Sequence, residues 1–354
     1  MFSMPDHRLA VGLAFLLIMP YFAQAQAELS LKDILEKNLQ ASGGREKIAQ
    51  VQNLAFKLGS SRYMTASDGR MKILTGKDPV VTEVLLVSSD KVQRNSFNNI
   101  SELGGTQKAA YLTLAKLYAG LFSLEKFEKE LQIQGLKSFG PEKLYHLSAK
   151  ADGLVVDFYL RTDDFLLKRM VFRGLTPEGE KYEVNYDYPP FEQAEGCLVP
   201  LSWFASQVGT RGNLVELTEL KINQPLENDF FSKLEVNVGT VSASTGLLKG
   251  NVLDFNMRPN GLTIVTNWTR KDIEQAGLKS NDRVSLTIDG VESELVFYAA
   301  ANELPAQNVL AQGARILSPM PRGGETFVIQ FMASDTSAIT PKLKILAPLE
   351  VKKK

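Results

Sequence analysis

Alternating apolar and polar residues dominate the first two thirds of the chain and predict β-strands. Tyr182, Val184, Tyr186 and Tyr188 alternate with charged or amide residues, and a Pro-Pro pair ends that run. Further strands are predicted over residues 54–58, 83–87, 154–161, 165–173, 199–205 and 214–222. Short turns join the segments between residues 144 and 223, so this part predicts consecutive antiparallel strands.

Two segments break the strand pattern and predict helices. The first begins at Ser30, with Asp33 as a capping-box partner, and a Gly-Gly pair ends it. The second covers residues 106–122, with Thr106 as candidate N-cap, and is apolar over most of its circumference. Such a helix is buried on several sides, either as a core helix or as a lid or plug across a concave sheet. The residues of this candidate lid are Tyr111, Leu114, Tyr118 and Leu121.

A long meander with one apolar face must cover that face or curl around it. If the sheet curls, the inward side chains line a cavity suited to an apolar ligand. The alternative is an ordinary core, and periodicity does not choose between the two. The candidate lining residues are Phe56, Leu58, Leu85, Val156, Phe158, Leu160, Tyr186, Leu201 and Trp203.

The composition changes near residue 236 and indicates a second domain. Residues 236–250 are rich in Gly, Ser and Thr and predict a linker. Short strands separated by Gly and Pro over residues 251–334 predict a small mainly-β domain, and residues 335–354 form a tail. The first domain would then cover residues 28–235.

The charge balance argues against two classes of partner. The 354 residues contain 40 Lys and Arg and 40 Asp and Glu. A neutral chain has no broad cationic field to attract nucleic acid or anionic membranes. We therefore expect neither nucleic-acid binding nor stable membrane insertion.

Rare residues limit the possible chemistry. The chain has two histidines, His7 and His146, and one cysteine, Cys197, so it can form neither an intrachain disulfide nor a Cys-based metal cluster. A catalytic triad or zinc site would have to use His146. Asp163-Asp164 is best explained as a hairpin turn, and Cys197 as a buried bystander thiol. We expect no catalytic residues, no metal and no cofactor.

The first 27 residues predict an export signal. Residues 9–23 are an apolar run of signal-peptide length, followed by small-x-small cleavage sites after Ala25 or Ala27. The alternative is a membrane anchor, but the segment before the run carries little positive charge. No cysteine follows the run, so acylation at that site is excluded. We expect an exported, periplasmic protein.

Four segments resemble the bacterial outer-membrane lipoprotein-sorting proteins, the lipoprotein-carrier-like superfamily. They are LKDILEKNLQASGGREKIAQVQNLAFKLG, YLRTDDFLLKRM, YEVNYDYPPFEQAEGCLVPLSWFASQVG and ELTELKINQPLENDFF, which together span about residues 28–235. The resemblance implies an α+β fold, with a strongly curved antiparallel sheet (an open half-barrel) and helices on its concave side. It also implies a cavity for acyl chains, and an acyl lipid or lipoprotein as partner. It carries no catalytic motif.

Residues 250–334 show two weaker resemblances. GNVLDFNMRPNGLTIVTNWTRKDIEQAGLKSNDRVSLTIDG is similar to the C-terminal β domain of the S-adenosylmethionine hydroxide adenosyltransferases, and AGLKSNDRVSLTIDGV to part of a PDZ domain. Neither the catalytic half of the first family nor the carboxylate-binding loop of the second has a counterpart here. This domain is therefore expected to be an accessory binding or spacer module.

These observations predict a periplasmic lipid or lipoprotein carrier-like binding protein that holds an acyl chain and is not an enzyme. Two alternatives stay open. One is an envelope-associated enzyme with its site in the second domain. The other is a scaffold that binds an envelope protein.

Overall fold

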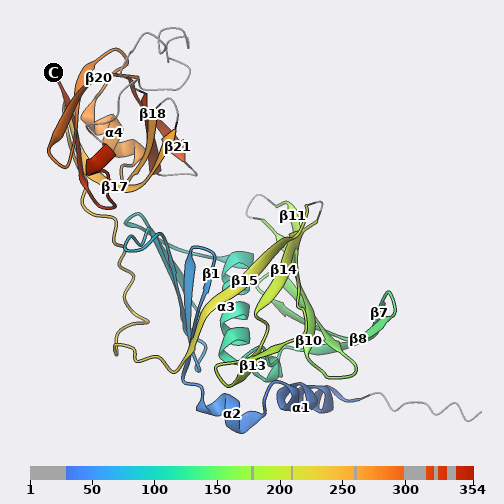
Figure 1. Ribbon diagram of the computed structural model, residues 1–354. Coiled ribbons are helices and arrows are strands. Elements are labelled where there is room, and N and C mark those ends of the chain that lie inside the picture. Colours follow the sequence, from blue (N-terminus) through green and yellow to red (C-terminus); the bar gives the residue numbers. More distant parts are fainter. Residues whose placement is uncertain are drawn as a thin grey trace, which may run out of the picture.

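The computed structural model describes residues 29–176, 179–208, 210–258, 261–298, 316–322, 326–332 and 340–354. The predicted signal peptide, residues 1–27, lies outside the described residues. The described chain forms two large sheets, one after the other in sequence (Figure 1).

The first sheet has 13 antiparallel strands in the order β6-β5-β4-β3-β2-β1-β15-β14-β11-β10-β9-β8-β7. Neighbours in space are mostly neighbours in sequence, and the pairing of β1 with β15 joins the first six strands to the rest. A separate hairpin of β12 (Glu192–Ala194) and β13 (Cys197–Val199) lies between β11 and β14 in sequence. The 13 strands are β1 (Asn53–Leu58), β2 (Ser61–Ala66), β3 (Met71–Thr75), β4 (Glu83–Val87), β5 (Val92–Ser96), β6 (Asn99–Glu102), β7 (Gln132–Phe139), β8 (Glu142–Ala151), β9 (Leu154–Arg161), β10 (Leu167–Leu175), β11 (Lys181–Asp187), β14 (Ser202–Gln207) and β15 (Asn213–Ile222).

The sheet bends around helix α3 (Gly105–Ala119). Figure 1 shows α3 between the two arms of the sheet, with β1 on one side and β10 on the other. Side chains from the inner face and from α3 form one hydrophobic core, in which Leu117 and Phe122 are fully buried. The predicted fold class is confirmed: this is an α+β protein with an open, curved antiparallel sheet, a helix on its concave side and a following mainly-β part.

Helices α1 (Leu31–Ala41) and α2 (Arg45–Gln50) precede the first strand. The predicted capping box at Ser30 is present, because the Asp33 N–H donates to Ser30 Oγ at 3.2 Å and the Asp33 carboxylate accepts from the Ser30 N–H. Buried Asn38 connects α1 with the turn between β9 and β10 and with the turn after α3. Its Nδ2 donates to the Phe165 carbonyl and its Oδ1 accepts from the Leu124 N–H, each at 2.8 Å.

The start of α3 differs from the prediction. Thr106 is not the N-cap, because Gly104 occupies that position and makes no side-chain capping bond. The Thr106 hydroxyl instead donates to the Leu175 carbonyl at 2.8 Å, which ties the helix start to the end of β10. A tertiary partner has therefore replaced the local one. The short helix η1 (Glu125–Phe127) follows α3.

The second sheet has eight strands in the order β16-β17-β18-β22-β21-β20-β19-β23, and it closes on itself because β17 also pairs with β23. All its pairs are antiparallel except β20 with β21. Helix α4 (Arg270–Ala276) begins with a capping box between Thr269 and Asp272, and η3 (Thr340–Lys342) precedes the last strand. The strands are β16 (Ser242–Ser244), β17 (Leu247–Arg258), β18 (Gly261–Thr266), β19 (Arg283–Ile288), β20 (Val291–Phe297), β21 (Ile316–Arg322), β22 (Thr326–Met332) and β23 (Pro348–Lys353).

This sheet extends beyond residues 251–334 at both ends. Strand β16 and the start of β17 fall in the segment predicted as a linker, and β23 falls in the segment predicted as a tail. Leu349 and Val351 of β23 are buried between β17 and β19, so the last strand supplies the closure. The alternation of apolar residues in β23 is short and three lysines follow it, so the pattern does not predict this strand.

The connection between the two sheets is held against the first sheet. Asn95 Nδ2 donates to the Leu234 carbonyl at 2.7 Å. Val80 before β4, Val238 in the connection and Leu253 of β17 share one small buried apolar cluster. An ion pair between Lys77 and Asp254, 2.8 Å apart, connects the loop after β3 with β17 of the second sheet.

Candidate ligand-binding cavity

The register of the first arm decides which side chains face inward. Tyr63 lies opposite Ile73, Ile73 opposite Leu85, and Leu85 opposite Arg94. Directly opposed residues of antiparallel strands share a face, so this row runs across the concave side. The row is apolar in the middle of the sheet and ends in a charged residue on β5.

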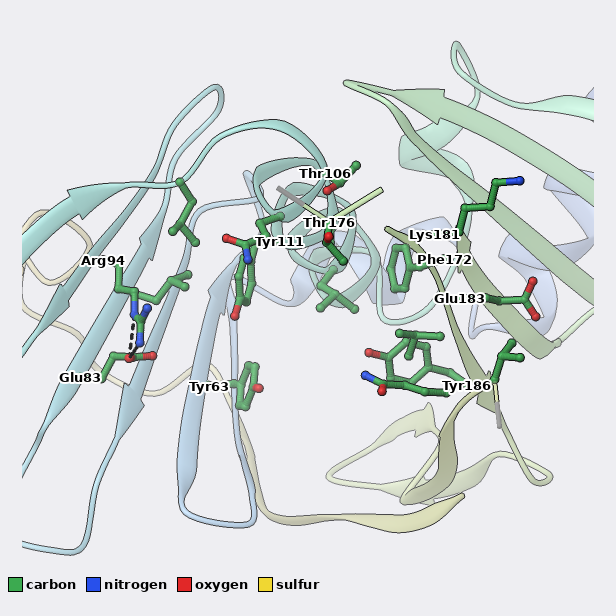
Figure 2. Close-up of a pocket in the computed structure, with 18 residues that line it drawn as sticks. Tyr63, Glu83, Arg94, Thr106, Tyr111, Phe172, Thr176, Lys181, Glu183 and Tyr186 are labelled. Atoms are coloured by element: carbon green, nitrogen blue, oxygen red, sulfur yellow. Dashed lines mark hydrogen bonds and ion pairs between the residues drawn. The ribbon is translucent and has the colours of Figure 1, made fainter. Parts of the chain in front are cut away.

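A cavity of about 820 Å³ opens between the two arms beside the N-terminal half of α3. Figure 2 shows Phe172 of β10 and Tyr186 of β11 on one side, facing Tyr63 of β2 and Tyr111 of α3 on the other. The volume lies within the roughly 300–1,000 Å³ of typical small-molecule sites. The lining residues are Tyr63, Glu83, Leu85, Arg94, Leu103, Thr106, Gln107, Ala110, Tyr111, Leu114, Phe172, Thr176, Lys181, Glu183, Val184, Tyr186, Gln207 and Val208.

Apolar side chains form part of the cavity wall. Leu114 and Ala110 come from α3, Leu85 from β4, and Phe172 and Val184 from the opposite arm. The Phe172 and Tyr186 rings meet edge-on, with centroids 5.7 Å apart and planes at 90°. This packing keeps both rings in place as a rigid apolar wall.

The Glu83–Arg94 ion pair is the charged part of the cavity wall on the first arm of the sheet. Arg94 Nε donates to Glu83 Oε2 at 2.7 Å, and Arg94 Nη2 donates to the same oxygen. The side chains are 45% and 26% exposed for Arg94 and Glu83, respectively, so the pair lies at the rim. Lys181 and Glu183 also border the cavity, but Figure 2 shows their side chains extending away from Phe172 and Tyr186.

Tyrosine hydroxyls add neutral polar groups. Burial raises the pKa of Tyr63 to about 12, with smaller contributions from Tyr111 and Tyr186, and burial also raises the pKa of Tyr111. Both phenols are therefore un-ionised at neutral pH and can donate a hydrogen bond. Among the described residues, no hydrogen-bond partner is found for either hydroxyl.

The predicted lining residues divide into two groups. Leu85 and Tyr186 line the cavity. The others lie in the hydrophobic core, where the C-terminal half of α3 and the following turn cover them. Leu58 and Leu201 are partly buried there, and the fully enclosed residues are Phe56, Val156, Phe158, Leu160 and Trp203.

The predicted lid residues divide in the same way along α3. Tyr111 and Leu114 line the cavity, whereas Tyr118 and Leu121 are buried in the core. The helix therefore packs tightly at its C-terminal end and borders open space at its N-terminal end.

Sequence reasoning missed most of the cavity wall, including Arg94, Phe172 and Val184. Phe172 and Val184 lie in predicted strands. They are directly opposite each other on β10 and β11, so both side chains lie on the inner face. The position of Arg94 follows from the β4–β5 hairpin, and β5 is not predicted by the alternation. The sequence feature that indicates this hairpin is the short polar segment between residues 87 and 92.

The remaining candidate groups lie elsewhere. His146 Nε2 contacts the Asp157 carboxylate at 2.8 Å on the outer face of the sheet, beside a polar hollow of about 400 Å³. Cys197 is buried, and burial raises the pKa of its thiol. Among the described residues, no group of three or more His, Cys, Asp or Glu side chains is placed to hold a metal ion.

Comparison with known proteins gives no family assignment. No family model matches the chain, and no curated protein matches it. A LolA superfamily protein from Nitrosomonas europaea aligns with 13% identity and a TM-score of 0.38, over 57% of this chain and 97% of its own. The lipoprotein LppX of Mycobacterium tuberculosis aligns with 10% identity and a TM-score of 0.20, over 56% of this chain and 99% of its own. At these scores the matches assign no function, and the likeness of residues 250–334 to the adenosyltransferases stays a prediction.

The described part of the chain contains no helix with the length and hydropathy needed to cross a membrane.

Proposed function

We propose that the protein is a periplasmic carrier-like binding protein that holds an acyl chain of a lipid or lipoprotein beside α3. The observation that carries this proposal is the cavity of about 820 Å³, whose wall combines apolar side chains with polar and charged ones. An amphiphile has the same combination, with an apolar chain and a polar end. The sequence resemblance to the lipoprotein-carrier-like superfamily supports the same kind of cargo. The predicted export signal supports the compartment.

The energetics favour an apolar chain in this place. Each methylene removed from water contributes about 0.8 kcal/mol. Leu85, Leu114 and Phe172 offer that chain an apolar surface, and no catalytic group is needed to hold it. The cavity is partly open to solvent, so a chain can enter and leave without unfolding the core.

A charge placed inside the cavity tests this proposal. Leu114 is half-buried and borders the cavity, so Leu114→Arg puts a cation where the acyl chain would lie. We expect this variant to bind a fluorescent fatty acid at least tenfold more weakly than the unmodified protein.

Leu136→Arg is the matched control. Leu136 lies on the edge strand β7 with 57% of its surface exposed, outside the cavity lining. It should bind the probe as the unmodified protein does. Equal affinity of a folded Leu114→Arg variant would show that the chain is not held beside α3.

A further inference from the structure

The Glu83–Arg94 ion pair at the rim of the cavity keeps one unused hydrogen-bond donor and one unused acceptor. Both bonds from Arg94 end on Oε2 of Glu83. Arg94 Nη1 and Glu83 Oε1 have no partner among the described residues. One cationic donor and one anionic acceptor are therefore available side by side without breaking the pair.

The charges near this pair do not change its balance. Glu183, across the cavity, accepts from Arg173 Nε at 2.8 Å on the outer face of the sheet. Lys181 alternates with inward-facing residues of β11 and borders the cavity, and Figure 2 shows its side chain extending away from Phe172. Glu83 and Arg94 are thus the charges on the inner face, and the described lining as a whole has two positive and two negative side chains.

One positive and one negative side chain side by side distinguish between ligands whose polar ends differ in charge. A purely anionic end bound to Arg94 lies beside the Glu83 carboxylate, and a purely cationic end bound to Glu83 lies beside the guanidinium. Each arrangement places like charges together, which weakens binding. A zwitterionic end gives each side chain a partner of opposite charge.

We propose that the cavity selects amphiphiles with a zwitterionic ammonium–phosphate end, as in phosphatidylethanolamine. The phosphate accepts from Arg94 and the ammonium donates to Glu83, because a guanidinium binds phosphate with good geometry. This inference rests on the proposed function, since it specifies the polar end of the acyl ligand.

Tyr111 extends the same site toward the apolar interior. Its hydroxyl has no partner among the described residues. The charges of Glu83 and Arg94 both act on the pKa of this phenol, in opposite directions. A phenol donor between a charged rim and an apolar wall suits the ester carbonyl that joins an acyl chain to its polar end.

Three lipids with identical chains test the selection: phosphatidylethanolamine, phosphatidylglycerol and diacylglycerol, each carrying the same fluorescent acyl group. A charge-assisted hydrogen bond contributes enough for about a tenfold change in affinity. We therefore expect phosphatidylethanolamine to bind about tenfold more tightly than either of the other two.

Two variants identify the side chains responsible. Glu83→Gln removes the ammonium partner and should reverse the preference in favour of phosphatidylglycerol. Arg94→Gln removes the phosphate partner and should weaken the binding of phosphatidylethanolamine far more than the binding of diacylglycerol. Glu219→Gln is the matched control, because it removes a cross-strand pair with Lys57 outside the cavity lining. This control should keep the original order.

The outcomes separate this inference from the proposed function. If all three lipids bind within twofold of one another, or if phosphatidylglycerol binds most tightly, the selection is wrong and the acyl-binding function stands. If none of the three binds, the proposed function fails and this inference fails with it.

Discussion

The ring of Tyr118 on α3 meets the ring of Phe56 on β1 edge-on, with centroids 5.1 Å apart and planes at 84°. Both side chains are buried in the core below the cavity. This contact fixes the C-terminal half of α3 to the sheet. The preceding part of the same helix, from Thr106 to Leu114, borders the cavity.

Replacing Tyr118 by Ala should therefore lower the stability of the fold. Removing a buried aromatic ring costs about 3–5 kcal/mol in the free energy of unfolding. Tyr111→Ala removes the same ring from the cavity wall, where Tyr111 is only partly buried. Urea unfolding should show a clearly smaller loss for Tyr111→Ala. Equal losses would mean that the two halves of α3 are packed alike.

A buried carboxylate makes Arg173 important for stability. Arg173 Nη1 contacts Asp157, whose side chain is 3% exposed and otherwise bonded to His146. Arg173→Met leaves that carboxylate without its cation, and we expect a loss of about 3 kcal/mol in the free energy of unfolding.

Arg45→Met is the control for this loss. Arg45 is 65% exposed and pairs with Glu125 at the surface, so its removal should cost less than about 1 kcal/mol. Chemical denaturation of both variants at neutral pH measures the two losses. A loss at Arg173 as small as that at Arg45 would contradict a structural role for the buried pair.

The Glu183 carboxylate should contribute to stability in a pH-dependent way. The hydrogen bond from Arg173 holds the pKa of Glu183 below its usual value of 4.5. A carboxyl whose pKa is lowered by folding stabilises the protein above its unfolded pKa, and this contribution disappears as the pH falls through the folded pKa. Glu183→Gln should therefore cost up to about 1 kcal/mol at pH 7, and this cost should shrink as the pH falls below 4.5. A pH-independent difference between the two proteins would argue against the ion pair.

The contact between the two sheets should depend on the small cluster around Val238. Val238 is 3% exposed and packs with Val80 and Leu253. Val238→Asp buries a charge there, and we expect faster cleavage of residues 224–246 in limited proteolysis while both sheets stay folded. Ile100→Asp, at a position that is 62% exposed on β6, is the control and should leave the cleavage rate unchanged. An unchanged rate for Val238→Asp would mean that this cluster does not hold the connection.

Sequence alternation identifies the inner face of the sheet but not the part of that face that stays uncovered. Phe158 and Tyr186 both lie directly opposite Met170 and belong to one inward-facing row. Phe158 is fully buried against Phe127, with ring centroids 5.2 Å apart, whereas Tyr186 lines the cavity. The two residues have the same periodicity, and only the path of the chain after α3 distinguishes them.

The helices illustrate the same limit. The capping box at Ser30 is local, so the sequence predicts the start of α1 correctly. Thr106 looks like a cap but bonds to Leu175, a residue 69 positions away. The Glu83–Arg94 pair likewise depends on the register of a hairpin, which the alternation does not predict on the β5 side.

Native mass spectrometry of the protein purified from an envelope fraction tests the central claim most directly. We predict a population heavier than the polypeptide by the mass of one acyl lipid, and the loss of that population in Leu114→Arg but not in Leu136→Arg. A spectrum that shows the bare polypeptide alone, before and after incubation with lipid vesicles, would contradict the claim that the cavity holds an acyl chain.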